Sequence, residues 1–179
     1  MASALLNVVL ENDQKLFFRL TDPLARMGGK RRFLLRCVSH LGDGHLWVLG
    51  GFWALLTQGR AGLRAFETGM TGCLGALLLF KIVKNRVARR RPDTSLHVGS
   101  RLLVPLDQYS FPSGHSATSL AFALSMGAFF PLALVPLLCL SLLISLSRVA
   151  LRVHYPLDLL AGWTLGAMTA GLGLSLFLR

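Results

Sequence analysis

Acidic residues are scarce in this chain. Asp and Glu together number 8 in 179 residues, against 19 Lys and Arg, and the formal net charge is +11. The sequence offers no cluster of carboxylates of the kind that holds magnesium. We therefore expect neither a metal nor any other cofactor.

Cysteine is also rare. Cys37, Cys73 and Cys139 are widely spaced, and none belongs to a CxxC pair. This pattern indicates neither a disulfide framework nor a zinc site. The N-terminal stretch MASALLNVVLENDQKLF lacks a basic region ahead of its apolar residues, so we do not expect it to be a signal peptide.

Charged residues of both signs make up only 15% of the chain, whereas hydrophobic residues make up 53% and the mean hydropathy is +0.57. Soluble domains carry about 25% charged residues, so the composition indicates a membrane protein. The excess of basic residues suits anionic lipid headgroups. Nucleic acid is not expected as a partner, because most of the chain consists of apolar segments of membrane length.

The apolar segments predict an all-α, polytopic membrane helix bundle in a single domain, residues 1–179. About 20 apolar residues are needed to cross a bilayer core of about 30 Å. We expect five spanning helices, at residues 41–57, 63–83, 113–130, 132–148 and 156–178, which form a core over 41–178. Small residues recur every fourth position in the last of them and predict close helix packing: Gly162, Gly166 and Ala170.

The first 40 residues are predicted to form an interfacial amphipathic helix followed by a basic connection. Residues 4–20 mix apolar and charged positions at helical spacing and are too polar to span a membrane. The apolar positions that share one face of this helix are Leu5, Val8, Val9, Leu16 and Leu20.

Two polar clusters fall on one side of the membrane, since two crossings separate them. The first is an expected active-site loop, residues 84–112, and the second is SRVALRVHYPLD, residues 147–158. Lys84, Arg91 and Arg148 would converge there, and three cations in one place bind an anion such as phosphate. The neighbouring Arg86, Arg89 and Arg90 are assigned instead to lipid headgroups.

The segment FPSGHSATS predicts a helix start that holds phosphate. Ser113 is a favourable N-cap, and Gly114 leaves the backbone open. The N–H groups and positive dipole end of a helix attract anions. His115 would project toward the same place, although a histidine near a helix start is often structural.

His154 and Asp158 flank the start of the last helix, whose first residue is predicted to be Pro156. The Asp158 carboxylate can reach back to one imidazole nitrogen, fix its tautomer and raise its basicity, which leaves the other nitrogen free to attack. Taken alone, the pair is more typical of an interfacial salt bridge. Together with the cations and His115, it indicates phosphoryl transfer by a histidine nucleophile.

Three blocks of this sequence resemble the signature of the type-2 phosphatidic acid phosphatases, relatives of the vanadium haloperoxidases. They are KNRVARRRP at 84–92, PSGH at 112–115 and SRVALRVHYPLD at 147–158. The resemblance implies that phosphate is bound by Lys84, Arg91, Arg148, Ser113 and Gly114. It also implies that His115 is the general acid, that His154 is transiently phosphorylated, and that Asp158 orients it.

The resemblance implies an integral membrane lipid phosphatase that acts on a phosphomonoester or pyrophosphate, in a bacterial inner membrane. The expected partners are a phosphorylated lipid substrate and membrane lipids. A lipid phosphotransferase with the same site and a non-catalytic phospholipid-binding protein are the alternatives. The side of the membrane stays open: the basic residues favour the cytoplasm, whereas bacterial relatives of this kind usually work on the outer face. Many membrane relatives have six spanning helices, one more than expected here.

Overall fold

A computed structural model describes residues 2–25, 27–92 and 108–177. Over these ranges the regular structure consists of seven α-helices and one isolated β-bridge, between Arg90 and Tyr109. The fold class is therefore all-α, as predicted. The helices are α1 (Ala2–Ala25), α2 (Gly29–His40), α3 (His45–Thr57), α4 (Gly59–Val87), α5 (Gly114–Phe129), α6 (Pro131–Ala150) and α7 (Pro156–Phe177).

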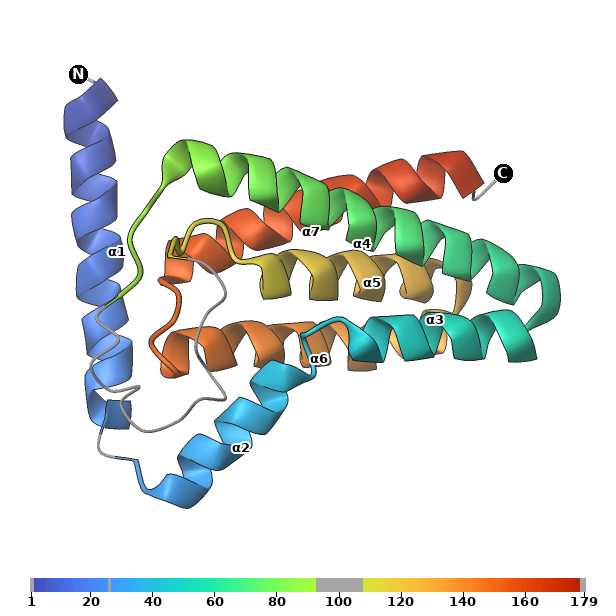
Figure 1. The fold of residues 1–179 in the computed structure, drawn as a ribbon, viewed down its shortest axis with the longest axis horizontal. Coiled ribbons are helices and arrows are strands. Elements are labelled where there is room, and N and C mark those ends of the chain that lie inside the picture. The colour runs from blue at the N-terminus through green and yellow to red at the C-terminus, as the bar shows by residue number, and fades with distance from the viewer. Residues whose placement is uncertain (1, 26, 93–107, 178–179) are drawn as a thin grey trace.

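Helices α3 to α7 form a bundle with their long axes roughly aligned (Figure 1). Helix α5 packs against α4, α6 and α7, while α3 packs against α4. The C-terminal ends of α4 and α6 and the N-terminal ends of α5 and α7 lie at the same end of the bundle. The two polar clusters of the sequence therefore meet at this end.

Three helices are long and apolar enough to cross a membrane: α4, α6 and α7. Helices α3 and α5 have 13 and 16 residues, fewer than the ~20 that a bilayer core requires. The predicted count of five spanning helices is thus not confirmed. Each of the five expected segments nevertheless overlaps one helix of the bundle.

Local sequence sets the helix starts that position the site. The Ser113 side chain caps α5 by accepting a hydrogen bond from the backbone N–H of Ser116, at 3.4 Å. Proline occupies the first position of both α6 and α7, where no intrahelical partner is needed for its missing N–H. Asp158 consequently lies in the first turn of α7, as the sequence predicts.

Helices α5 and α7 approach each other closely because α7 presents glycine to the backbone of α5. A Cβ atom on Gly166 would lie 2.3 Å from the carbonyl oxygen of Ala117, and one on Gly162 would lie 2.4 Å from that of Ser113. Ala170 is fully buried in the same stripe. The predicted role of these small residues in packing is confirmed.

Helix α1 crosses the end of the bundle where the polar clusters meet (Figure 1). Phe17 is buried there and packs edge-on against Tyr155, with ring centroids 5.0 Å apart. The apolar face predicted for residues 4–20 is exposed, as expected of a face that meets lipid. That α1 lies at the membrane surface remains a prediction.

Helix α2 replaces part of the predicted basic connection and packs against α6. Its residues are mainly Lys, Arg and Leu, which favour helix, and it contains no proline. The expected active-site loop also begins later than predicted, because α4 continues to Val87. Residues 93–107 of that loop lie outside the described residues.

Candidate active site

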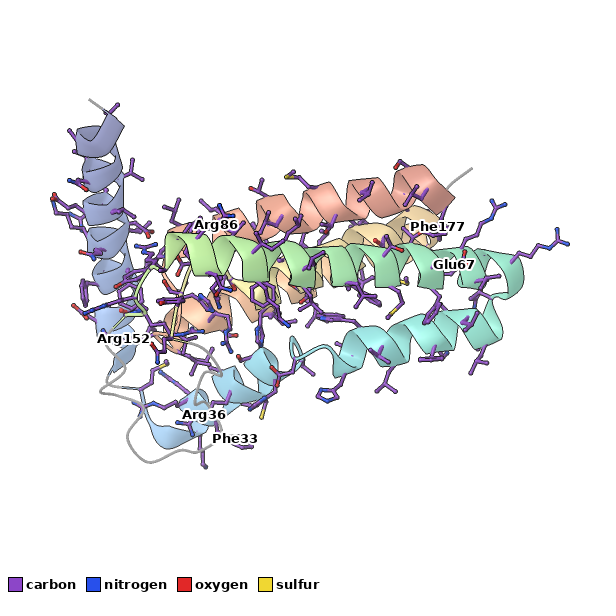
Figure 2. The ribbon with its side chains drawn as sticks, turned by 45° about the horizontal axis from the view of Figure 1, so that its top comes forward. Phe33, Arg36, Glu67, Arg86, Arg152 and Phe177 are labelled. Atoms are coloured by element: carbon purple, nitrogen blue, oxygen red, sulfur yellow. The ribbon has the colours of Figure 1, made fainter. Side chains whose placement is uncertain are left out.

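Six of the eight predicted site residues line one cavity of about 610 Å³, whose basic end lies where the polar clusters meet, and five of the six have basic side chains. Figure 2 shows Arg36, Arg86 and Arg152 toward this end, whereas Glu67 and Phe177 lie toward the other. The five residues come from α4, the segment after it, α5, α6 and the turn before α7: Lys84, Arg91, His115, Arg148 and His154. Gly114 also lines the cavity.

The rest of the cavity wall is mostly apolar and belongs to α3, α4 and α5, together with His40 of α2 and the turn at residues 42–44. A cavity with a basic end and an apolar body suits a ligand with an anionic head and a hydrocarbon tail. Its larger apolar lining residues are Trp47, Phe66, Met70, Leu74, Leu77, Phe80, Phe122 and Met126.

His154 is almost fully buried, and its Nε2 lies 3.4 Å from a guanidinium nitrogen of Arg91. The same nitrogen of Arg91 donates to the carbonyl oxygen of Val153 at 2.7 Å, which fixes it beside the imidazole. Burial, followed by the charges of Arg148, Arg91 and Lys84, holds the pKa of His154 well below its ordinary value. The imidazole is therefore neutral, which is the nucleophilic form.

Asp158 is fully buried behind His154, but the pair is not yet hydrogen-bonded. His154 Nδ1 lies 3.5 Å from Asp158 Oδ2, and it has no hydrogen-bond partner among the described residues. Asp158 instead accepts from Arg89 at 2.8 Å and from the backbone N–H of Tyr155 at 2.9 Å. A closing movement of about 0.5 Å would complete the pair. The predicted rise in the basicity of His154 is outweighed by burial and the cations.

Arg89 lies inside this network and not among lipid headgroups, which corrects the sequence-based assignment. Its guanidinium pairs with Asp158 and with Asp13 of α1, each at 2.8 Å, and stacks 3.9 Å above the ring centroid of Tyr155. Asp13 also accepts from the backbone N–H of Leu157. Two buried carboxylates require a cation between them, and Arg89 supplies it.

His115 is bound by a carboxylate that sequence reasoning missed. Its Nε2 lies 2.8 Å from Oδ1 of Asp43, in the turn between α2 and α3. The other oxygen of Asp43 accepts from Nδ1 of His40 at 2.6 Å. The hydrogen bond from His115, with a smaller contribution from His40 and against the effect of burial, holds the pKa of Asp43 well below its usual range.

The remaining predicted ligands surround the same end of the cavity. Lys84 and Arg148 are both buried; Arg148 donates to the hydroxyl of Ser39, and Lys84 lies 5.2 Å from the ring centroid of Phe80. Ser113 does not line the cavity, because its side chain is fully buried as the cap of α5. Ser113 therefore orients the start of α5. The positive end of that helix dipole lies at Gly114, which lines the cavity together with the three cations.

The family model of the PAP2 superfamily matches residues 67–179, well over half of the chain. The chain belongs to the PAP2 superfamily. All eight predicted site residues fall inside the matched region. The two carboxylates that the sequence reasoning missed, Asp13 and Asp43, fall outside it.

Curated PAP2-type relatives act on lipid phosphates. Lipid A 1-phosphatase of Rhizobium johnstonii is 31% identical, over 79% of this chain and 69% of its own length. Decaprenylphosphoryl-5-phosphoribose phosphatase of Mycobacterium tuberculosis is 32% identical, over 74% of this chain and 72% of its own length. Phosphatidylglycerophosphatase B of Bacillus subtilis is 33% identical over 51% of this chain and 47% of its own length.

Solved structures show the same fold. The crystal structure of Aquifex aeolicus LpxE matches with a TM-score of 0.75 and 20% identity, over 90% of this chain and 94% of that one. The transmembrane PAP2-type phosphatidylglycerolphosphate phosphatase from Bacillus subtilis matches with a TM-score of 0.68 and 24% identity, over 95% and 86%. With its three long apolar helices, this PAP2 chain is an integral membrane phosphatase.

Proposed function

We propose that this chain hydrolyses a phosphomonoester or pyrophosphate on a membrane lipid, without a metal, through a phosphohistidine at His154. One observation carries the proposal: three cations, His115 and His154 share the basic end of a cavity whose remaining wall is mostly apolar. A phosphate group matches the first part of that cavity and a lipid tail matches the second.

Phosphate binding falls to Lys84, Arg91 and Arg148. Their charges neutralise the equatorial oxygens of the phosphoryl group, the work that metal ions do in many other phosphoryl-transfer enzymes. The start of α5, capped by Ser113 and opened by Gly114, adds backbone N–H groups and the positive end of the helix dipole.

In the first step, Nε2 of His154 attacks phosphorus from the side occupied by Arg91. The bond from phosphorus to the lipid oxygen breaks, and His115 donates its proton to that oxygen. Asp158 closes onto Nδ1 of His154 and stabilises the charge that develops on the ring.

In the second step, the neutral His115 accepts a proton from a water molecule. The oxygen of that water attacks phosphorus, the phosphorus–nitrogen bond breaks, and inorganic phosphate leaves. His154 returns to the neutral state, so the protons taken and given balance over the cycle.

The substrate candidates are undecaprenyl pyrophosphate, phosphatidylglycerol phosphate, phosphatidic acid and lipid A phosphates, and the proposed location is a bacterial inner membrane. The names of the relatives cover lipid A, prenyl and glycerophospholipid phosphates.

The test is phosphate release by the purified protein from a panel of these lipids in detergent. The His154→Ala variant, purified in parallel, serves as the blank for contaminating phosphatases. We expect release from at least one lipid phosphate that exceeds this blank. Activity on none of them would contradict the proposal, and transfer of labelled phosphate to an added acceptor lipid would favour a phosphotransferase.

A further inference from the structure

His115 has to carry a proton in surroundings that oppose it. The ring lines the cavity together with Arg148 and Arg91, and its burial, followed by the two guanidinium charges, disfavours an imidazolium there. A general acid nevertheless must be protonated when the leaving oxygen departs. A negative charge against His115 would resolve this conflict.

The turn between α2 and α3 brings such a charge directly against the ring. Asp43 Oδ1 accepts from Nε2–H of His115 at 2.8 Å. The turn can come this close because Gly42 has no side chain: a Cβ atom there would lie 2.7 Å from Cδ2 of His115. His40 holds the second oxygen of the carboxylate, at 2.6 Å, so Asp43 is fixed from both sides.

We propose that Asp43 is a positioning residue that stabilises the protonated form of His115 and turns its Nδ1 toward the leaving group. This rests on the proposed function, in which His115 is the general acid. As the bond from phosphorus to the lipid oxygen breaks, Nδ1 gives its proton to that oxygen, while Nε2–H stays bonded to Asp43. In the second step Nδ1 takes a proton from the attacking water.

The experiment compares two substrates in the same enzyme preparation. A lipid phosphomonoester has a poor leaving group that needs an acid, whereas p-nitrophenyl phosphate has one that departs unprotonated. The ratio of the two rates reports acid catalysis, and it does not depend on the fraction of correctly folded protein. It is therefore measurable even in a poorly folding variant.

Asp43→Asn keeps an oxygen that can accept from His115 but removes the charge. Since general acid catalysis contributes about 10²–10⁴-fold, we expect losses of about 10-fold on the lipid and below about 3-fold on p-nitrophenyl phosphate. Asp43→Ala also removes the acceptor and should widen the difference. Asp22→Asn is the matched control. Asp22 is an exposed residue of α1 that pairs with Arg152, so its substitution should leave the ratio of the two rates unchanged.

His115→Ala is measured alongside to separate two failures. If it lowers the lipid rate selectively while Asp43→Asn and Asp43→Ala lower both rates equally or neither, the role of Asp43 is wrong and the proposed function stands. If His115→Ala itself lowers both rates equally, the acid role of His115 fails, and the inference about Asp43 fails with it. A selective loss in both residues supports the proposal.

Discussion

Two histidines of the site face one cavity but are held in opposite ways. His154 is surrounded by cations and has its aspartate 3.5 Å away, while His115 is in direct contact with a carboxylate. Burial and the cations disfavour the charged form of both rings, and only the carboxylate beside His115 favours the charged form that an acid needs.

His154→Ala removes the proposed nucleophile without disturbing helix packing, because the residue lies in the turn between α6 and α7. We expect the rate to fall by at least about 10³-fold on both lipid phosphates and p-nitrophenyl phosphate, since a nucleophile is needed whatever the leaving group. Steady-state kinetics, with circular dichroism as the check on folding, measures this. Retention of near wild-type activity on either substrate would contradict the assignment.

The acid side of the pH–rate profile should also reflect the protonation of His154. Because its pKa lies well below 6.5, the ring loses its nucleophilic form only at pH values below that point. We therefore expect kcat/KM, corrected for ionisation of the substrate, to stay high as pH falls to 6.5 and to decline below it. A decline that begins above pH 6.5 would show that the cations do not act on His154 as described.

At this scale the sequence predicted the residues of the three motif blocks but not their partners. Lys84, Arg91 and His154 were identified from spacing within each block. Asp13 and Asp43 were missed because they contact site residues that are distant in sequence. Asp13 does so from the N-terminal helix and Asp43 from the turn before α3. The only local signal for Asp43 was a charged residue between two glycines, directly before an apolar helix.

At the scale of helices, the α5–α7 contact is the most sensitive to side-chain size. Gly166→Ala would place a methyl group 2.3 Å from the carbonyl oxygen of Ala117, and the backbones would have to separate. We expect a loss of about 1–3 kcal/mol in stability, measured by thermal unfolding in detergent. Gly171→Ala, where a methyl group would meet nothing within 4 Å, is the control and should not destabilise. Equal stability of the two variants would contradict the packing described.

The starts of the helices could be predicted from sequence better than their lengths. Ser113, Pro131 and Pro156 act through local backbone chemistry, so they mark α5, α6 and α7 correctly. Helix α2 was predicted as a connection because its basic residues obscure an apolar face. Its packing against α6 is a tertiary contact, which a local sequence pattern does not reveal. The short α3 and α5 could not be distinguished from full spans by hydropathy.

For the whole molecule, activity should survive chelation and be blocked by vanadate. No group of three or more His, Cys, Asp or Glu side chains that could hold a metal occurs in the described ranges 2–25, 27–92 and 108–177. The cationic end of the cavity suits a trigonal-bipyramidal oxyanion of the kind that vanadate forms. Phosphate release is measured once with EDTA and once with increasing vanadate, which tests the two expectations separately. Loss of activity in EDTA that added magnesium restores would contradict the proposed mechanism.

The crossing of α1 over the end of the bundle has a consequence for how the enzyme meets its substrate. If α1 lies in the plane of the membrane as predicted, its contact through Phe17 with Tyr155, in the turn before α7, would hold His154 at the depth of the lipid headgroups. A lipid phosphate would then reach the site by lateral diffusion within its own leaflet. The rate should depend on the number of substrate molecules per unit of membrane area. Added inert lipid should therefore slow turnover even when the total amount of substrate in the assay is constant.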